Sequence, residues 1–265
     1  MPYIISAIIA YLIGSISSSV IISKKLAGFD VREKGSGNAG STNVLRTVGK
    51  KAALLTLICD ILKGVIAVLV AFLIGLFVKE ANKAVMVQLA ALFVVIGHTF
   101  PIFFGFKGGK GVATSLGVLL MINWRIGLIC LVFALAIMAL TRMVSLGSIG
   151  AAVLFPVLVI FMQKSNYLVK GSRISYIIFG ICLAALVIFN HRSNLVRIIN
   201  GNENKLSFKK KDDSASKSVV VEKSEEEPTE EPEPEVELKE QPEIEVEKEP
   251  EDENKKKSKS KKSNK

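Results

Sequence analysis

GSGNAGSTNVLR, residues 35–46, is a polar stretch that lies between two long apolar runs. Its glycines allow backbone N–H groups to approach a phosphate closely, and its hydroxyl and amide side chains add neutral donors. Arg46 at its end supplies a charged fork that fits a phosphate. We therefore interpret the stretch as an anion-binding segment at the edge of a membrane domain. An ordinary glycine-rich loop has the same composition and remains the alternative from this stretch alone.

The apolar run before this stretch, residues 4–23, contains no charged residue and is followed directly by Lys24 and Lys25. It is long enough to cross the hydrocarbon core of a bilayer. A cleaved signal peptide is the rival interpretation, but no basic residue precedes the apolar core. We predict an uncleaved span whose N-terminus lies outside.

Further apolar runs follow and predict an all-α integral membrane protein with about seven transmembrane helices and cytoplasmic polar loops. The fourth run, residues 112–123, is too short to cross a bilayer unaided. We therefore expect the glycine-rich loop before it to dip into the membrane domain, where irregular backbone is tolerated only if it lines a protein cavity. The other expected spans are residues 52–78, 84–104, 126–141, 143–163 and 174–190.

Charge divides the chain into two parts. Residues 1–205 contain 20 Lys and Arg against 5 Asp and Glu, whereas residues 206–265 contain 14 Lys against 19 acids and almost no aromatic residue. We predict a membrane domain over residues 1–205 and a disordered, charged tail over residues 206–265, because the tail cannot bury enough apolar surface to fold.

Basic residues also predict the orientation in the membrane. The loops expected inside hold 13 Lys and Arg before position 206, and the outer turns hold 6. This excess agrees with the positive-inside rule. We expect a multi-pass protein of the cell membrane with its N-terminus outside and with the polar loops and the tail in the cytoplasm.

A second polar segment, GHTFPIFFGFKGGKGVAT, spans residues 97–114. Lys107 and Lys110 bracket two glycines, so two ammonium groups and several backbone donors can face one anion. The match to a Walker loop fails, because Gly111 stands where a Ser or Thr would hold magnesium. A dinucleotide fingerprint over residues 35–40 fails too, because no βαβ unit surrounds it. Simple solvation of the lysines at the membrane interface is the alternative.

A third polar segment, HRSNLVRIINGNENKL, follows the last apolar run as residues 191–206. If the helix continues, His191 and Asn194 lie on one face with Arg197 near them. A basic helix that contacts lipid headgroups explains the arginines equally well. His98 and His191 are the two histidines of the chain, and for each a structural and a catalytic role stay open.

Asp60 and Lys63 lie one turn apart inside the second span. Ionisable residues at that depth are costly unless they pair, so a structural salt bridge and a functional site are both open. The acids of residues 1–205 form no close pair and no metal-binding pattern, and no Gly-x-Ser-x-Gly segment occurs. We therefore expect no metal, no cofactor and no serine acyl-enzyme. The three cysteines stand far apart in apolar runs, which predicts buried hydrophobic residues.

Together the three polar segments closely resemble the three cytoplasmic motifs of the PlsY family, the bacterial acyl-phosphate:glycerol-3-phosphate acyltransferases. DILKG, residues 60–64, resembles a further recurring element of that family. The resemblance covers residues 1–205, although Ser41 stands where alanine is usual and Ala39 where proline is common. It implies transfer of a fatty acyl group from acyl phosphate to the 1-hydroxyl of glycerol 3-phosphate, which gives lysophosphatidic acid and phosphate. The expected partners are these substrates and the lipid bilayer, not nucleic acid, and the oligomeric state stays open.

The resemblance also implies roles for individual residues. Acyl phosphate is already activated, so orientation and charge stabilisation suffice without a covalent intermediate. Lys107 and the backbone of residues 108–111 are expected to bind the acyl-phosphate group and to stabilise the developing oxyanion. The proton acceptor is either the substrate's own phosphate or His191. The residues expected in catalysis are Ser36, Arg46, Lys107, His191 and Asn194, and those expected to bind substrates are Gly35, Gly37, Asn38, Thr42, Asn43, His98, Gly108, Gly109, Lys110, Gly111, Arg197 and Glu203.

A transporter or channel for a phosphorylated metabolite is the main rival interpretation. Seven spans, a basic inner mouth and ionisable residues within the membrane all suit it. However, the sequence shows no inverted repeat, and its polar residues gather on one side rather than at mid-bilayer. A lipid-binding scaffold without catalytic activity is the third possibility.

Overall fold

The apolar runs of the sequence form helices in the computed structural model, which describes residues 1–78, 80–162 and 167–206. No β-strand occurs among these residues, which confirms the all-α class. Apart from its first residue, the predicted tail lies outside the described part of the chain. The helices are α1 (Pro2–Gly14), α2 (Ser18–Ala27), η1 (Val31–Glu33), α3 (Ser41–Thr47), α4 (Lys50–Phe77), α5 (Lys83–Thr99), η2 (Ile102–Phe104), α6 (Val112–Ile122), α7 (Trp124–Thr141), α8 (Val144–Phe161), α9 (Arg173–Asn190) and α10 (Arg192–Ile199).

Six helical segments of the described residues are long and apolar enough to cross a membrane. The first combines α1 and α2 across a break at residues 15–17, and the others contain α4, α5, α7, α8 and α9. α6 has only 11 residues and is the short helix expected from the fourth apolar run. The seven expected spans therefore correspond to six segments of membrane length and one shorter helix.

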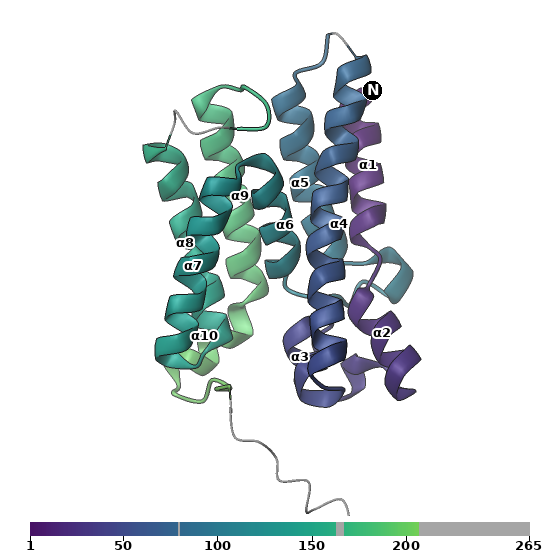
Figure 1. Cartoon of the computed structure of the whole chain (residues 1–265), viewed down its shortest axis with the longest axis vertical. Coiled ribbons are helices and arrows are strands. Elements are labelled where there is room, and N and C mark those ends of the chain that lie inside the picture. The colour runs from purple at the N-terminus through teal and green to yellow at the C-terminus, as the bar shows by residue number, and fades with distance from the viewer. Residues whose placement is uncertain (79, 163–166, 207–265) are drawn as a thin grey trace, which may run out of the picture. The chain divides into compact units, whose positions relative to one another are not determined.

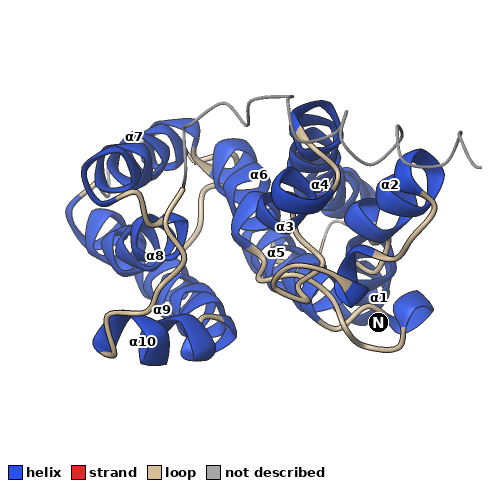
Figure 2. Cartoon of the chain, turned by 90° about the horizontal axis from the view of Figure 1, so that it is seen from below, coloured by secondary structure: helices blue, strands red, loops and turns tan. Residues whose placement is uncertain are grey.

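The long helices run side by side, and α2, α3 and α10 lie at one end of them, the lower end in Figure 1. Seen from that end in Figure 2, α6 lies between α7, α8 and α9 on one side and α1, α4 and α5 on the other. The segments before α3, before α6 and along α10 all lie toward this end. The three polar stretches of the sequence are therefore gathered at the same end of the bundle.

Glycines allow the helices to pack with their backbones close together, as is common in membrane proteins. A Cβ atom on Gly97 of α5 would lie 2.2 Å from the Tyr11 carbonyl oxygen of α1. A Cβ atom on Gly117 of α6 would lie 2.0 Å from the Ile61 carbonyl oxygen of α4. The short helix α6 is thereby held directly against α4.

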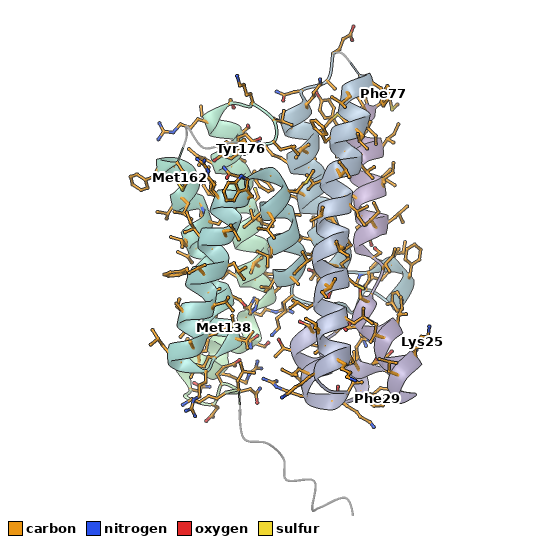
Figure 3. All side chains as sticks on the ribbon, viewed as in Figure 1. Lys25, Phe29, Phe77, Met138, Met162 and Tyr176 are labelled. Atoms are coloured by element: carbon orange, nitrogen blue, oxygen red, sulfur yellow. The ribbon has the colours of Figure 1, made fainter. Side chains whose placement is uncertain are left out.

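The long helix α4 turns its large apolar side chains outward. Leu54 is 58% exposed and Leu62 is 48% exposed, whereas Asp60 and Lys63 are only 2% and 6% exposed. Figure 3 shows apolar side chains covering the flanks of the bundle, with Phe77 at the upper end of α4. Lipid rather than water is the solvent that suits such a surface.

The three cysteines follow the prediction of burial only in part. Cys130 is buried, Cys59 is half-buried and Cys182 is exposed. The prediction is wrong for Cys182, which lies beside the exposed Ile181 on the outer side of α9. An apolar helix in lipid does not need to turn its small hydrophobic residues inward, because both sides of it are apolar.

Candidate active site

A cavity of about 340 Å³ lies among the three polar segments, within the size range of small-molecule sites. α7 and α8 complete its wall with Leu131, Ala134, Ser145 and Ser148. The structure therefore brings residues from all three segments to one place. The predicted site residues that line the cavity are Ser36, Asn38, Thr42, Asn43, Arg46, His98, Lys110, Gly111, His191, Asn194, Arg197 and Glu203. Those that do not line it are Gly35, Gly37, Lys107, Gly108 and Gly109.

Asn43 shapes the first polar segment from within. Its side-chain nitrogen donates to the Val31 carbonyl oxygen at 2.8 Å and to that of Lys34 at 3.0 Å. Its Oδ1 accepts the backbone N–H of Ser36 at 2.9 Å. Gly35 has φ +63°, and a Cβ atom there would lie 2.3 Å from Asn43 Oδ1. Gly35 is therefore needed for the loop's shape rather than at the cavity wall.

The second polar segment folds back on the C-terminal end of α5. The Gly108 N–H donates to the Thr99 carbonyl oxygen at 3.1 Å, and the Gly109 N–H donates to that of His98 at 3.0 Å. A Cβ atom on Gly109 would lie 2.1 Å from His98 Nε2, so only glycine fits. Both N–H groups are used within the protein. That the backbone of residues 108–111 binds the acyl-phosphate group stays a prediction, and within that range Lys110 and Gly111 line the cavity.

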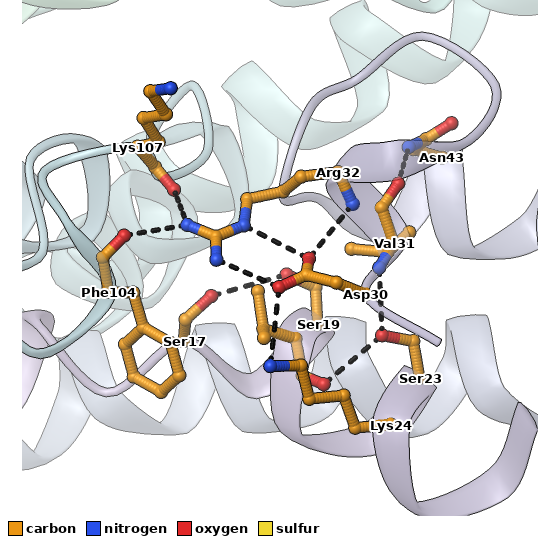
Figure 4. Close-up of polar contacts among 11 residues, drawn as sticks. Ser17, Ser19, Ser23, Lys24, Asp30, Val31, Arg32, Asn43, Phe104 and Lys107 are labelled. Atoms are coloured by element: carbon orange, nitrogen blue, oxygen red, sulfur yellow. Dashed lines mark hydrogen bonds and ion pairs between the residues drawn. The ribbon is translucent and has the colours of Figure 1, made fainter. Parts of the chain in front are cut away.

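The two lysines of this segment have different surroundings. Lys107 is exposed and does not line the cavity, and Figure 4 shows its side chain directed away from the neighbouring polar contacts. Lys110 lines the cavity, and its Nζ donates to Asn194 Oδ1. The geometry thus favours Lys110 for the charge-stabilising role that the sequence analysis gives to Lys107.

Glu203 anchors the third segment to α8. Its Oε1 accepts hydrogen bonds from Asn194 at 2.7 Å and from Ser145 at 2.8 Å, and its Oε2 accepts one from Arg197 at 2.9 Å. Burial favours the neutral carboxyl group, but these hydrogen bonds prevail and lower the pKa of Glu203. The fixed carboxylate directs the amide oxygen of Asn194 toward Lys110.

Lys110 is a cation whose surroundings change its protonation. Its pKa is lowered to about 8, mainly by burial and also by the charges of Arg197 and Arg46, while Glu203 acts in the opposite direction. At neutral pH the ammonium form still prevails. A desolvated cation at the wall of a cavity interacts strongly with negative charge that develops beside it.

His191, at the end of α9, is 2% exposed and also lines the cavity. Its Nδ1 lies 2.8 Å from the Val187 carbonyl oxygen, and because a carbonyl can only accept, Nδ1 carries the hydrogen. Burial lowers the pKa of His191 to about 4. The ring is therefore neutral at physiological pH, and its Nε2 has a lone pair that can accept a proton or a hydrogen bond.

Asp60 and Lys63 form a buried salt bridge of 2.8 Å inside the bundle. Lys63 Nζ also donates to the Ile16 carbonyl oxygen at 3.0 Å, in the break between α1 and α2. His98 Nδ1 lies 3.6 Å from Asp60 Oδ1. Asp60 and His98 line the cavity whereas Lys63 does not, so the negative member of the pair reaches the site.

A second, apolar cavity of about 90 Å³ adjoins the first. Its walls come from α6, α7, α8 and α9, with Phe155 and Leu183 among them. The two cavities share Val112, Leu116, Leu131, Ala134 and Ser148 as lining residues. The polar cavity and an apolar space between helices therefore lie side by side and share part of their wall.

Sequence reasoning missed several residues of the site. Ser145 and Ser148 lie in an apolar helix, where a serine gives no functional signal. Asp30 and Arg32 form a salt bridge of 2.8 Å outside the cavity, and the one signal that could have found them is a charged pair two positions apart beside a polar loop. Within the described part of the chain, no group of three His, Cys, Asp or Glu residues is suited to a metal ion.

Comparisons with known proteins agree on one family. The family profile described as Glycerol-3-phosphate acyltransferase matches residues 4–201. A glycerol-3-phosphate acyltransferase of Clostridioides difficile (strain 630) is 45% identical over 212 residues, covering 78% of this chain and 97% of that protein. One from Thermoanaerobacter sp. (strain X514) is 44% identical over 210 residues, covering 79% and 98%. The crystal structure of PlsY, an integral membrane glycerol 3-phosphate acyltransferase, in its glycerol 3-phosphate form has a TM-score of 0.66 at 37% identity and covers 78% of this chain and 96% of that one.

Proposed function

The chain belongs to the glycerol-3-phosphate acyltransferase family, and from this premise we propose that it transfers a fatty acyl group from acyl phosphate to the 1-hydroxyl of sn-glycerol 3-phosphate. The products are lysophosphatidic acid and inorganic phosphate, and the reaction is the first step of membrane phospholipid synthesis. The observation that carries the proposal is a cationic cavity that shares part of its wall with an apolar one.

The charge of the cavity suits two phosphorylated substrates. Arg46, Lys110 and Arg197 bring three cationic side chains to its wall, one from each polar segment. The acids at the wall, Asp60 and Glu203, are already paired with Lys63 and Arg197. Arg46 and Lys110 are therefore the wall cations without a carboxylate partner among the described residues, and they supply the positive charge that a site for phosphates requires.

The apolar cavity suits the fatty chain of the donor. It lies beside the polar chamber and between helices that face lipid, so a chain that extends from a phosphate in the polar chamber finds an apolar space next to it. A donor with a fatty chain and a phosphate directly on its acyl carbon fits this arrangement. Acyl phosphate has both groups.

The reaction needs no covalent intermediate in this site. The 1-hydroxyl oxygen of glycerol 3-phosphate attacks the acyl carbonyl carbon, and the bond between that carbon and the phosphate oxygen breaks. Phosphate leaves with the bonding electron pair, and the hydroxyl proton passes to a base. Negative charge that develops on the carbonyl oxygen is stabilised by a nearby cation. Lys110 is the cation that we assign to this role.

We assign roles to the other site residues from their positions at the cavity wall or in the loops around it. Ser36, Thr42 and Arg46 of the first segment, with His191 and Asn194 of the third, hold the phosphates and the acceptor hydroxyl. Neutral His191, whose Nε2 accepts, is the protein candidate for the base, and the acceptor's own phosphate is the other. Asn43 and the glycines keep the loops in shape, and Arg197 and Glu203 hold Asn194.

We place the protein in the cell membrane with its N-terminus outside and its cavity facing the cytoplasm. The excess of basic residues in the loops around the cavity supports this orientation. The cavity then opens on the side where phosphorylated metabolites are found. A cysteine introduced at position 36 is expected to resist labelling from outside, whereas one at position 172 is expected to react.

An acylation assay on the purified full-length protein in lipid vesicles tests the function. With acyl phosphate and radiolabelled glycerol 3-phosphate, we expect lysophosphatidic acid and phosphate to form in equal amounts. The same vesicles report uptake of glycerol 3-phosphate when the acyl donor is omitted. Uptake without acyl transfer would show that the protein is a transporter rather than an enzyme. Absence of both uptake and acyl transfer would favour a lipid-binding scaffold.

A further inference from the structure

Arg32 lies three residues before the first polar segment and binds the second one, although it does not line the cavity. Its Nη1 donates to the Phe104 carbonyl oxygen at 2.6 Å and to the Lys107 carbonyl oxygen at 3.1 Å. These carbonyls lie 72 and 75 positions further along the chain. Figure 4 shows the guanidinium group between them and the carboxylate of Asp30.

Asp30 holds that guanidinium group in one orientation. Arg32 Nε donates to Asp30 Oδ1 at 3.0 Å, and Nη2 donates to Oδ2 at 2.8 Å, so the pair is a two-pronged salt bridge. The Arg32 backbone N–H donates to the same carboxylate at 3.0 Å. The Asp30 side chain is 7% exposed, and Lys24 Nζ lies 3.6 Å from it. With the hydrogen bond from Arg32 as the main cause, the pKa of Asp30 falls to about 2, so the clamp is intact at physiological pH.

The carbonyls that Arg32 holds belong to the segment that carries Lys110. This segment is irregular, and Phe106 within it has the unusual φ of +58° for a residue with a side chain. It also meets the first segment through a hydrogen bond of 3.4 Å from the Ala39 N–H to the Gly108 carbonyl oxygen and through Phe104, which packs against the cluster that contains Ala39 and Val44. Arg32 adds two hydrogen bonds to the backbone of residues 104–107, both shorter than the bond from Ala39.

We propose that Arg32, clamped by Asp30, is a positioning residue that holds residues 104–107 against the first polar segment and so directs Lys110 into the cavity. The proposal rests on the proposed function for its kinetic consequence, whereas its structural part stands on the contacts alone. Arginine is required because its planar fork binds the carboxylate and the carbonyls at once. A lysine at this position supplies one compact ammonium group and cannot reach all of them.

Two measurements test the positioning role of Arg32, and both compare the full-length Arg32→Ala and Arg32→Lys variants with the wild type. The first is amide hydrogen exchange of residues 105–111, which we expect to become about tenfold faster in Arg32→Ala while the transmembrane helices are unchanged. The second is steady-state kinetics. We expect kcat to fall about 100-fold, because small misplacements of a catalytic group have effects of this order, with KM for glycerol 3-phosphate changed less than about threefold.

Arg32→Lys separates charge from geometry, and we expect its kcat to stay about tenfold below the wild-type value. Lys25→Gln is the matched control, because Lys25 is an exposed cation on α2 next to Lys24, and both readouts should match the wild type. Unchanged exchange in residues 105–111 would overturn the proposal, as would faster exchange with wild-type kcat, faster exchange in all helices, or full activity in Arg32→Lys. If the wild-type protein transfers no acyl group, the proposed function fails, and the exchange result alone decides whether Arg32 holds the segment.

Discussion

The first and second polar segments both border the cavity, but they are held in opposite ways. Residues 35–46 are shaped from within, because Asn43 binds backbone groups of its own neighbourhood, including the Ser36 N–H. Residues 105–111 are held from outside, by carbonyls at the end of α5 and by the guanidinium group of Arg32. When the residues that hold a segment lie within it, the sequence of the segment indicates its structure. When distant residues hold a segment, its sequence does not indicate which of its side chains faces the site.

We expect the largest difference in acyl transfer between substitutions of the two lysines in the second segment. Lys110→Ala removes a buried cation at the cavity wall, and we expect kcat to fall about 10²- to 10³-fold, as when one oxyanion-stabilising donor is lost. Lys107→Ala removes an exposed cation that acts only through a screened field, and we expect less than about a threefold change. Steady-state acyl transfer by both variants measures the difference.

Lys50→Ala is the control for the loss of one exposed positive charge near the same end of the bundle. It should behave like Lys107→Ala. A large loss in Lys107→Ala with a small one in Lys110→Ala would reverse our assignment. It would also show that the second segment takes up another arrangement when substrate is bound.

Asn43 tests whether the first segment is indeed shaped from within. Asn43→Ala removes the donor to three backbone carbonyls and leaves the Ser36 N–H without its acceptor, and the unpaired N–H costs about 1–3 kcal/mol. We expect kcat/KM to fall about tenfold through loss of loop shape. Hydrogen exchange should rise in residues 35–43 and stay unchanged in residues 105–111. Asn43→Asp keeps the acceptor but loses the donors, so an Asn43→Asp enzyme with full activity would contradict this account.

We expect substitution of Glu203 to have a smaller effect, which is seen in the dependence of kcat on pH. Lys110 has a pKa of about 8, so the rate should fall as pH rises through this value and the ammonium group loses its proton. The carboxylate of Glu203 raises that pKa. In Glu203→Gln the alkaline limb of the kcat profile should therefore move to lower pH. Glu33→Gln, at an exposed position, should leave the limb in place, and an unmoved limb in Glu203→Gln would disprove the coupling.

Deletion of residues 209–265 should have the smallest effect. These residues follow the described part of the chain, and their composition changes abruptly from that of the membrane domain. We expect the truncated, membrane-inserted protein to keep its specific activity within about twofold, since a low-complexity charged segment lacks the means to build a site. A tenfold loss would show that the tail contributes to the reaction.

Several features of the protein could be predicted from the sequence. Long uncharged runs have to become helices in lipid, because each backbone polar group there needs a partner within its own segment. The short run before Asn123 could also be recognised as a helix below membrane length. Asn43, Arg46, His191 and Asn194 could be identified because they stand in polar segments directly beside apolar runs, where donors and cations of this kind suit a phosphate.

Only the tertiary structure decided which side chains of the polar segments line the cavity. Nothing in the sequence favours Lys110 over Lys107, because the direction of a side chain in an irregular loop depends on which distant groups hold the backbone. Here those groups are the Arg32 guanidinium and the carbonyls of His98 and Thr99. The carbonyls of Thr99 and His98 accept the N–H groups of Gly108 and Gly109. Ser145 became part of the site for the same reason, since it meets Glu203 only when the segment after α10 packs against α8.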